Sequence, residues 1–328
     1  MSVEIFEENR RVLAGVAYRI LGSAVDAEDV VQEAWLRWSE VDTTRVDDPR
    51  AYLIRVTSRL AIDRLRRVKA RREAYVGPWL PEPISTEPDL SEHVELADSV
   101  DLALLVVLET LSPLERAVFV LHEAFGMSYT EIGEVIGRAE PATRQLARRA
   151  RDHVRERRPR FDVNRAERRQ VTRRFIEACT EGDLEGLLEL LSQNVTLVGD
   201  GGGKARAPVR VIEGATKVAR FLAGIASEGQ TRRFLASIGL PEDVTLGVEL
   251  AEVNGGPAMV VTLEGRPVTV IALLVADGAV QTVYLIANPE KISRLGRAGT
   301  AELPVSPPAD DHPEADVTDE RSDTSGGA

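Results

Sequence analysis

The sequence predicts a multidomain fold in which two all-α domains precede an α+β domain. The chain has 328 residues, which is enough for two or three separate cores. Apolar residues recur at helical spacing through the first half, and a proline-rich stretch interrupts them. Beyond residue 194, short strand-like runs separated by glycine turns predict an antiparallel sheet. These three observations define the expected architecture.

Three helices are predicted to form the first domain, residues 1–74. An amphipathic helix over 4–21 stops at Gly22, and a second follows through 26–38. The acids on its outer side are, by themselves, typical of a solvated face. The third helix opens at Asp47-Asp48-Pro49, where proline and acids suit a first turn, and runs to about Arg72. Its arginine-rich side is suited to phosphate contact.

Residues 75–93 are predicted to be an extended interdomain linker. Four of the 17 prolines fall within eleven residues of this stretch, at Pro78, Pro81, Pro83 and Pro88. Trp79 is unusual in such a segment, because exposed linkers rarely carry an isolated tryptophan. We therefore expect Trp79 to dock on a neighbouring domain.

Residues 94–158 are predicted to be a second helical domain that ends in a helix-turn-helix. Ser128 and Glu131 have the spacing of a capping box, Gly137 suits the end of that helix, and Pro141 suits the first turn of the next. The second helix has little apolar surface and many arginines, which suits a DNA groove better than a core. The alternative is a solvated basic face on a structural helix. Its thin apolar stripe consists of Thr143, Ala147, Ala150 and Val154.

The net charge of -12 conceals two strongly basic windows. Residues 45–72 hold ten basic against three acidic residues, and residues 138–174 hold fourteen against five. Two basic surfaces on an acidic frame favour two contacts with one polyanion.

The composition also excludes several classes of protein. No apolar run is long enough to span a membrane, and the N-terminus has no signal-peptide pattern, so a cytoplasmic chain without a membrane partner is expected. The single cysteine, Cys179, excludes an internal disulfide framework, and four scattered histidines show no metal-ligand spacing. No metal site is predicted.

Three sequence blocks together resemble a known family. DAEDVVQEAWLRW (26–38), DDPRAYLIRVTSRLAIDRLRR (47–67) and LSPLERAVFVLHEAFGMSYTEIGEVIG (111–137) resemble, in order and spacing, regions 2 and 4 of the extracytoplasmic-function sigma factors of bacterial RNA polymerase. YVGPWLPEP, DGGGK (200–204) and NPEK (288–291) resemble the subgroup with a C-terminal SnoaL-like domain. In that subgroup the extension is thought to regulate the factor from within, in place of a separate anti-sigma protein.

The resemblance implies a factor that binds core RNA polymerase and directs promoter-specific initiation. It assigns 1–74 to region 2, 94–158 to region 4 and 162–298 to a regulatory domain. The implied partners are promoter DNA and core polymerase, through the clamp helices of its largest subunit and its flap. The implied core-polymerase contacts are Asp29, Gln32, Glu33 and Arg37. The implied minus-ten contacts are Arg55, Arg59, Asp63, Arg66 and Arg67. The implied minus-thirty-five contacts are Arg138, Arg144, Gln145, Arg148, Arg149 and Arg151.

The C-terminal half is predicted to be an α+β cone. Two helices within 162–191 divide at Gly182-Asp183, a strand covers 195–200, and a helix covers 214–226. Four strands are expected at 244–253, 257–264, 267–276 and 279–287, joined by hairpin turns. This order places helices on one face of a curved antiparallel sheet, as in a SnoaL-like domain.

The motifs of this half favour a regulatory contact over catalysis. Acid/base chemistry needs convergent Asp, His or Tyr side chains, but residues 160–300 contain no histidine and one tyrosine, Tyr284. The triple glycine also lacks the Lys-Ser/Thr pair of a phosphate loop. We therefore expect no catalytic residue and no cofactor, although a DNA-binding regulator with a ligand-sensing or enzymatic domain is the alternative. The predicted interdomain residues are Trp79, Asp200, Gly201, Gly202, Gly203, Lys204, Asn288, Pro289, Glu290 and Lys291.

Residues 299–328 form an acidic tail with eight acids and few large apolar side chains. Such a composition predicts disorder. The tail is expected either to compete with DNA for the arginine-rich faces or to keep the protein soluble.

Overall fold

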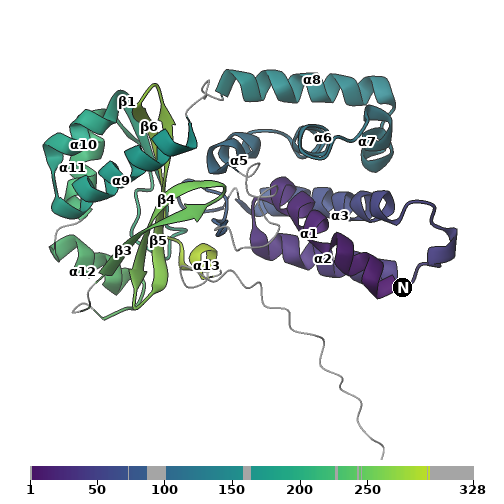
Figure 1. Ribbon diagram of the computed structural model, residues 1–328, viewed down its shortest axis with the longest axis horizontal. Helices are drawn as coiled ribbons and strands as arrows, with labels where there is room; N and C mark the ends of the chain where they lie inside the picture. Colours follow the sequence, from purple (N-terminus) through teal and green to yellow (C-terminus); the bar gives the residue numbers. More distant parts are fainter. Residues whose placement is uncertain are drawn as a thin grey trace, which may run out of the picture.

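A helical half and an α+β half lie side by side in the computed structural model (Figure 1). The structure describes residues 2–72, 74–86, 101–157, 164–225, 228–241, 244, 246–293 and 295. Residues 87–93 of the predicted linker, residues 94–100 and the acidic tail lie outside the described residues.

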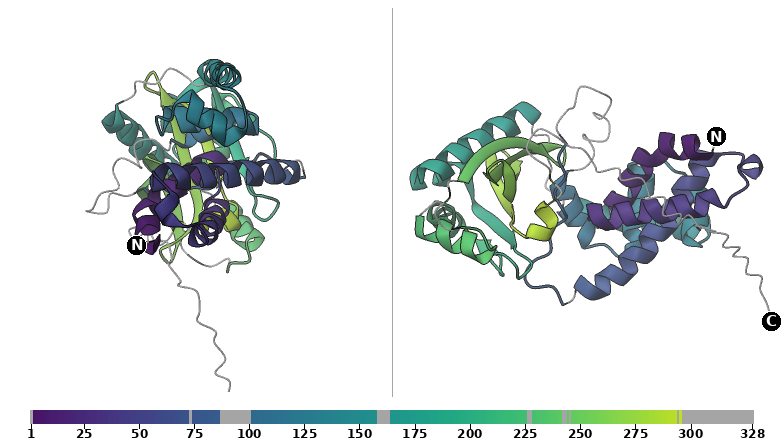
Figure 2. Two further views of the ribbon diagram at one scale, coloured as in Figure 1. Left: turned by 90° about the vertical axis from the view of Figure 1, so that its right-hand side faces the viewer. Right: turned by 90° about the horizontal axis from the view of Figure 1, so that it is seen from below.

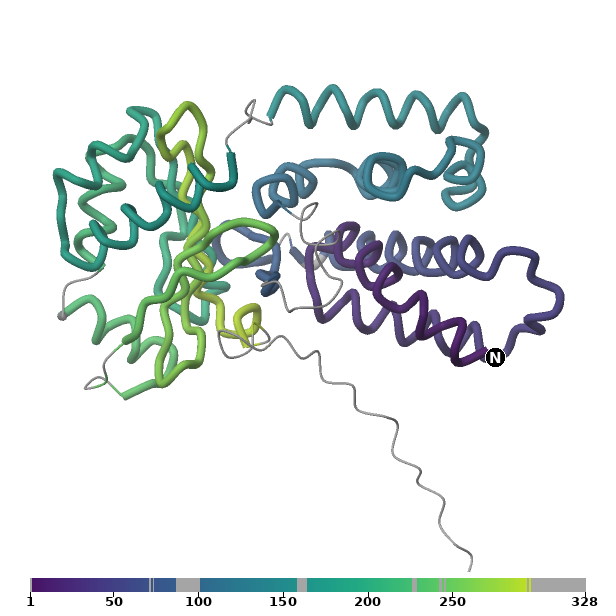
Figure 3. The backbone as a smooth tube through the Cα atoms, in the orientation of Figure 1, coloured from purple at the N-terminus to yellow at the C-terminus, as the bar shows by residue number. Residues whose placement is uncertain are grey.

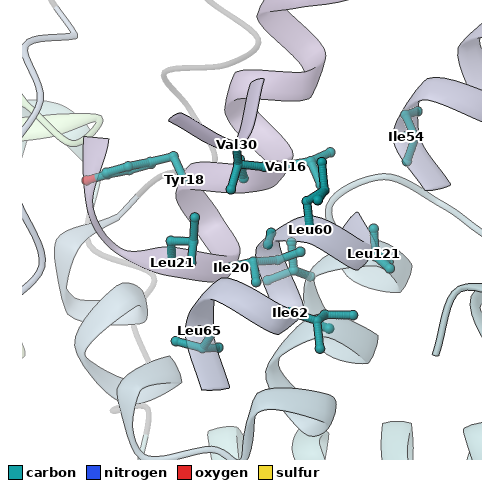
Figure 4. Packing of buried hydrophobic residues seen from close by; sticks show 14 of the residues in the cluster. Val16, Tyr18, Ile20, Leu21, Val30, Ile54, Leu60, Ile62, Leu65 and Leu121 are labelled. Carbon is teal, nitrogen blue, oxygen red and sulfur yellow. The ribbon is translucent and has the colours of Figure 1, made fainter. Parts of the chain in front are cut away.

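The first helical group contains α1 (Ser2–Leu21), α2 (Ala24–Ser39), the short 3-10 turn η1 (Thr43–Arg45) and α3 (Pro49–Arg72). The side chain of Ser23 caps α2 by accepting a hydrogen bond from the Asp26 amide at 3.2 Å. Buried aliphatic side chains from all three α-helices meet in one cluster (Figure 4). Leu121, from the next helical group, lies in the same cluster, so the two groups share a core.

The second helical group contains α5 (Leu102–Glu109), α6 (Pro113–Glu123), α7 (Tyr129–Ile136) and α8 (Glu140–Arg157). The break between α5 and α6 falls at Ser112-Pro113, as predicted, and Ser112 forms a capping box with Glu115. The tube in Figure 3 shows α3 lying beside α6 and α7, with α8 on their far side. The α3 helix is therefore packed on two sides, by α1 and α2 and by α6 and α7.

The C-terminal half contains helices α9 (Arg165–Glu181), α10 (Leu184–Leu190), α11 (Ala215–Ile225), α12 (Glu228–Ser237) and α13 (Pro289–Ile292). Its strands are β1 (Leu191–Asp200), β2 (Ile212–Glu213), β3 (Leu246–Val253), β4 (Gly256–Leu263), β5 (Arg266–Ala276) and β6 (Ala279–Ile286). The α+β class agrees with the sequence prediction.

The prediction of a wholly antiparallel sheet is wrong. The strand order is β2-β1-β6-β5-β4-β3, and β1 pairs with β6 in parallel. The hairpins β3–β4, β4–β5 and β5–β6 turn at Asn254-Gly255, Glu264-Gly265 and Asp277-Gly278, where all six residues have positive φ. Such two-residue turns are recognisable in sequence, whereas β1 joins the sheet through a long crossover that no local pattern reveals.

Each face of the sheet packs against a different part of the chain (Figure 2). One face forms a core with α9, α10 and α11. The other face packs with α13, with Leu80 of the linker and with Leu102 of α5. The linker and the second helical group are thus attached to the C-terminal sheet by buried apolar contacts.

Candidate functional site

The helix-turn-helix forms from the local signals in its sequence. Ser128 and Glu131 make both hydrogen bonds of a capping box, and Gly137 ends α7 in the left-handed conformation with φ 67°. A residue with a Cβ is strained at that φ, which explains glycine at the turn. The four residues buried along α8 are Thr143, Ala147, Ala150 and Val154, as predicted.

The polar residues of α8 divide into two groups. Arg144 and Arg148 point away from the core, with side chains that are 63% and 84% exposed. Arg151 instead lies toward the protein, because it pairs with Glu123 of α6 at 2.7 Å and donates a hydrogen bond to the hydroxyl of Tyr129. Arg149 lies 3.7 Å from Glu115 of α6. Arg138 and Gln145 are also exposed. The side chain of Arg149 is nevertheless 60% exposed, so the outward group available to DNA contains Arg138 of the turn before α8 and Arg144, Gln145, Arg148 and Arg149 of α8.

Two of the predicted minus-ten residues contact the helix-turn-helix. The guanidinium of Arg59 donates hydrogen bonds to the carbonyl oxygens of Glu134 at 2.7 Å and Val135 at 3.3 Å, at the C-terminal end of α7. Arg55 pairs with the Glu134 carboxylate at 3.1 Å. Cations are favoured at a helix C-terminus, since the helix dipole is negative there. In this arrangement both arginines are engaged within the protein.

The remaining predicted minus-ten residues lie on the solvent side of α3. Arg66 pairs with Asp63 at 2.9 Å, and Arg67 donates a hydrogen bond to the carbonyl oxygen of Asp63. All three side chains are exposed, and among the described residues their contacts stay within this one helix. Exposed pairs of this kind are weak and yield easily to a polyanion.

The outer face of α2 presents the four predicted core-polymerase residues together. Gln32 is exposed, Glu33 pairs with Arg37 at 2.7 Å, and Asp29 accepts a hydrogen bond from Arg64 of α3 at 2.8 Å. Leu36 lies within this polar face and is 62% exposed. The sequence pattern did not predict Leu36, although it falls outside the apolar stripe of its helix.

An aspartate at the end of β1 binds the linker to the C-terminal domain through hydrogen bonds. The Asp200 carboxylate is fully buried and accepts hydrogen bonds from the Tyr75 hydroxyl at 2.5 Å, the Leu80 amide at 2.8 Å and the Lys291 ammonium at 2.6 Å. Lys291 also donates to the Leu80 carbonyl oxygen at 2.5 Å. We call Tyr75, Trp79, Leu80, Asp200 and Lys291 the linker clamp. The clamp joins the DGGGK and NPEK motifs of the C-terminal domain to the linker between the domains.

Trp79 lies between two cations in this clamp. The Lys291 Nζ atom is 3.2 Å from the ring centroid, and the Arg72 guanidinium is 3.9 Å from it. Burial lowers the pKa of Lys291 to about 8, while the neighbouring Asp200 charge opposes that change. Lys291 is therefore mainly protonated at neutral pH and forms a buried ion pair with Asp200.

The glycine run permits the close approach of the linker. A Cβ at Gly202, where φ is 59°, would lie 2.4 Å from the Asn288 side-chain nitrogen and 2.8 Å from the Tyr75 hydroxyl. Asn288 caps α13 and donates a hydrogen bond to Tyr75 at 2.8 Å. Gly201 and Gly203 flank this contact, and Pro289 begins α13. The Lys204–Glu290 ion pair lies at the exposed edge.

A second contact ties the linker to α1 and to the β3–β4 turn. The Tyr18 hydroxyl donates to the Glu82 carbonyl oxygen at 2.6 Å and accepts from the Asn254 amide group at 2.7 Å. The Asn254 backbone amide donates to the Ile84 carbonyl oxygen at 3.0 Å. None of these residues was predicted, because the tyrosine and the asparagine are 236 positions apart.

A buried ionic cluster joins the two helical groups. The Glu109 carboxylate of α5 pairs with Arg72 of α3 and, at 2.6 Å, with Arg116 of α6. Arg116 is fully buried and also donates to the Arg19 carbonyl oxygen of α1 at 3.0 Å. Burial lowers the pKa of Arg72, and the nearby Glu109 charge opposes this effect. One carboxylate is therefore shared by two guanidinium groups at the helical junction.

The groups considered for catalysis are engaged or buried. Asp200 belongs to the linker clamp, and burial raises the pKa of Tyr284 to about 12. Within the described residues, no group of three or more His, Cys, Asp or Glu side chains is arranged to hold a metal ion. No helix in the described part of the chain is long and apolar enough to cross a membrane.

The comparisons with known proteins match each part of this architecture. Residues 5–72 match the Sigma-70 region 2 model, and residues 101–154 match the Sigma-70 region 4 model. The chain is 40% identical over 298 residues to the ECF RNA polymerase sigma factor SigJ of Mycobacterium tuberculosis, covering 89% of this chain and 94% of that relative. It is 37% identical to a probable ECF sigma factor, SigI, of the same species, covering 88% and 93%. The crystal structure of SigJ superposes with a TM-score of 0.68 at 38% identity, covering 88% of this chain and 97% of that one.

Proposed function

The chain belongs to the extracytoplasmic-function sigma factors of RNA polymerase, and from this premise we propose which of its surfaces bind polymerase and DNA. The outer face of α2 binds core polymerase, α3 binds the minus-ten element, and the outward group of α8 binds the minus-thirty-five element. The C-terminal domain restrains these contacts from within. One observation supports this proposed restraint, namely the set of hydrogen bonds that the linker clamp makes at Asp200.

The contact between α3 and α7 supports a closed state that must open on a promoter. The two promoter elements are separated by about 25 base pairs, which is roughly 85 Å of B-DNA at about 3.4 Å per step. Arg59 of α3 hydrogen-bonds directly to α7. The helices that read two elements so far apart cannot keep this contact. Promoter binding therefore requires the two helical groups to separate.

The C-terminal sheet stabilises the closed state because it contacts both the linker that follows the first helical group and α5 of the second helical group. Leu80 of the linker and Leu102 of α5 pack on the same face of the sheet. Opening the helical groups by way of the linker requires the clamp to loosen. We propose that this internal restraint replaces a separate anti-sigma protein, and that loosening the clamp raises the fraction of open, active protein.

Replacing Arg148 with alanine is expected to weaken binding of the minus-thirty-five element by about tenfold and to reduce the salt slope by about 1. The Arg148 side chain is 84% exposed, and its ion-pair partner, Asp152, is 3.8 Å away. Arg151→Ala is the control with a smaller expected loss, because Arg151 pairs with Glu123 at 2.7 Å and donates a hydrogen bond to Tyr129. Binding of a promoter duplex by the protein with core polymerase, across salt concentrations, measures both. Equal affinity and slope for wild type and Arg148→Ala would place α8 away from DNA.

Replacing Leu36 with aspartate is expected to weaken the complex with core polymerase by about tenfold or more, because an exposed apolar anchor would lose its burial at the interface. Val3→Asp is the matched control, since Val3 is 56% exposed on α1. Size-exclusion chromatography or a native gel with purified core enzyme reports the complex. If Leu36→Asp formed the complex as well as the wild type does, α2 would not be part of the interface. If the wild-type protein failed to bind core polymerase, the polymerase assignment itself would be contradicted.

A further inference from the structure

The C-terminal domain contains a cavity of about 690 Å³ that the linker clamp does not use. Its walls come from the end of α9, the 206–208 segment, α11, α12 and the strands β3 to β6. A volume of this size lies within the range of about 300–1,000 Å³ that small-molecule sites occupy. The apolar walls include Phe221, Leu222, Phe234, Met259, Ile271 and Leu285.

Two arginines are the charged groups of this cavity among the described residues that line it. The side chains of Arg206 and Arg220 are exposed, which places them at its opening. Neither forms an ion pair with another described residue. Two uncompensated guanidinium groups beside an apolar interior favour a ligand with an apolar body and one anionic end.

The lining is suited to binding rather than to acid/base chemistry. The described lining residues include no Asp, Glu, His, Tyr or Lys. Burial raises the pKa of the Cys179 thiol, which also lines the cavity, to about 12, so this thiol is neutral near pH 7. A general acid or base working near neutral pH is therefore lacking from these residues.

We propose that this cavity binds a carboxylic acid with an apolar body, whose carboxylate is held by Arg206 and Arg220. The apolar body lies among the aromatic and aliphatic walls between α11 and the sheet. The affinity comes mainly from burial of apolar surface, and the arginines select the carboxylate over neutral or cationic compounds of the same length.

The cavity wall adjoins β1 and the segment after β6 beside the linker clamp, so the ligand is placed to act on the clamp through this backbone. Ala287 lines the cavity, and its amide donates a hydrogen bond to the Asp200 carbonyl oxygen at 2.8 Å. Pro208 lines it from the other side and packs against Gly199, where a Cβ would lie 2.6 Å from the Pro208 Cδ atom. This coupling rests on the proposed function, in which the clamp controls opening.

Titration of the full-length protein with decanoate, 1-decanol and decylamine tests the binding site. Decanoate is expected to bind saturably and at least about tenfold more tightly than the other two, a difference of about 1.4 kcal/mol. The double variant Arg206→Ala/Arg220→Ala should lose this preference, whereas Arg210→Ala, on a nearby exposed arginine outside the lining, should keep it. Absence of saturable decanoate binding, or equal binding of all three compounds, would overturn the proposal.

A cavity-filling variant locates the bound molecule. A Cβ at Gly224, which lines the cavity, meets no atom within 4 Å, so Gly224→Phe should fill the space and abolish decanoate binding. Gly229→Phe is the control, because Gly229 is exposed, equally unobstructed and outside the lining. Undiminished binding to Gly224→Phe would place the ligand elsewhere.

Hydrogen exchange in residues 74–86 tests whether the bound ligand acts on the linker clamp, independently of whether it binds in the cavity. A change in linker exchange on adding decanoate, absent in Gly224→Phe, supports coupling to the clamp. Saturable binding without such a change contradicts the coupling and leaves the ligand site in place. A change in linker exchange without a change in transcription contradicts the proposed control by the clamp.

Discussion

Replacing Asp200 with asparagine is expected to destabilise the linker contact by about 3–5 kcal/mol, the usual effect of removing one partner from a buried ion pair. Asp200 is fully buried, and the Lys291 side chain is 6% exposed. The variant leaves the ammonium group of Lys291 buried without its counter-charge. The tyrosine hydroxyl and the Leu80 amide also lose a charged acceptor.

Hydrogen exchange at the Leu80 amide measures this effect locally, because that amide donates directly to Asp200. Its protection should fall by about 100-fold or more. Lys204→Ala is the matched control from the same motif, since the Lys204–Glu290 pair is exposed and contributes about 0–1 kcal/mol at most. Combining Asp200→Asn with Lys291→Met should cost less than the sum of the two single changes. Additive losses, or unchanged protection in Asp200→Asn, would show that the pair does not hold the linker.

Replacing Glu109 with glutamine is expected to have a similarly large effect at the junction of the helical groups. The change removes the shared counter-charge of Arg72 and Arg116, whose side chains are 10% and 0% exposed. Two buried guanidinium groups then repel each other without compensation, at a cost of about 3–5 kcal/mol. The expected fall in melting temperature is at least about 5 °C.

Calorimetry of the full-length protein tests this change against Glu134→Gln. Glu134 also joins the two helical groups, through Arg55, but both side chains are substantially exposed, at 55% and 37%. Its replacement should cost about 1 kcal/mol or less. Equal melting temperatures for Glu109→Gln and Glu134→Gln would mean that the buried cluster does not stabilise the closed arrangement.

Local signals in the sequence predicted most of the helical elements. The capping box at Ser128, the left-handed Gly137 and the four buried residues of α8 follow from spacing within one or two turns. The glycine-containing hairpin turns of the sheet are equally local. α12 was not predicted, because its segment contains few apolar residues and has glycines at 229 and 239, a composition that resembles a loop.

Contacts between distant parts of the chain were not predictable in this way. Motif resemblance indicated Asp200 and Lys291, but their direct pairing across 91 residues has no local signature. The parallel pairing of β1 with β6 is of the same kind. Tyr75, which was not predicted, supplies the hydroxyl that joins Asp200 to Asn288. Only the folded chain shows that Arg55 and Arg59 face α7.

Transcription with purified core polymerase from one promoter tests the internal restraint most directly. At equal protein concentration, Asp200→Asn is expected to yield more transcript than the wild-type protein, from the same start site, while Lys204→Ala matches the wild type. The start site should not change, because the outward residues of α8 do not contact the clamp. Unchanged transcript from an Asp200→Asn protein that has lost Leu80 amide protection would contradict control by the C-terminal domain.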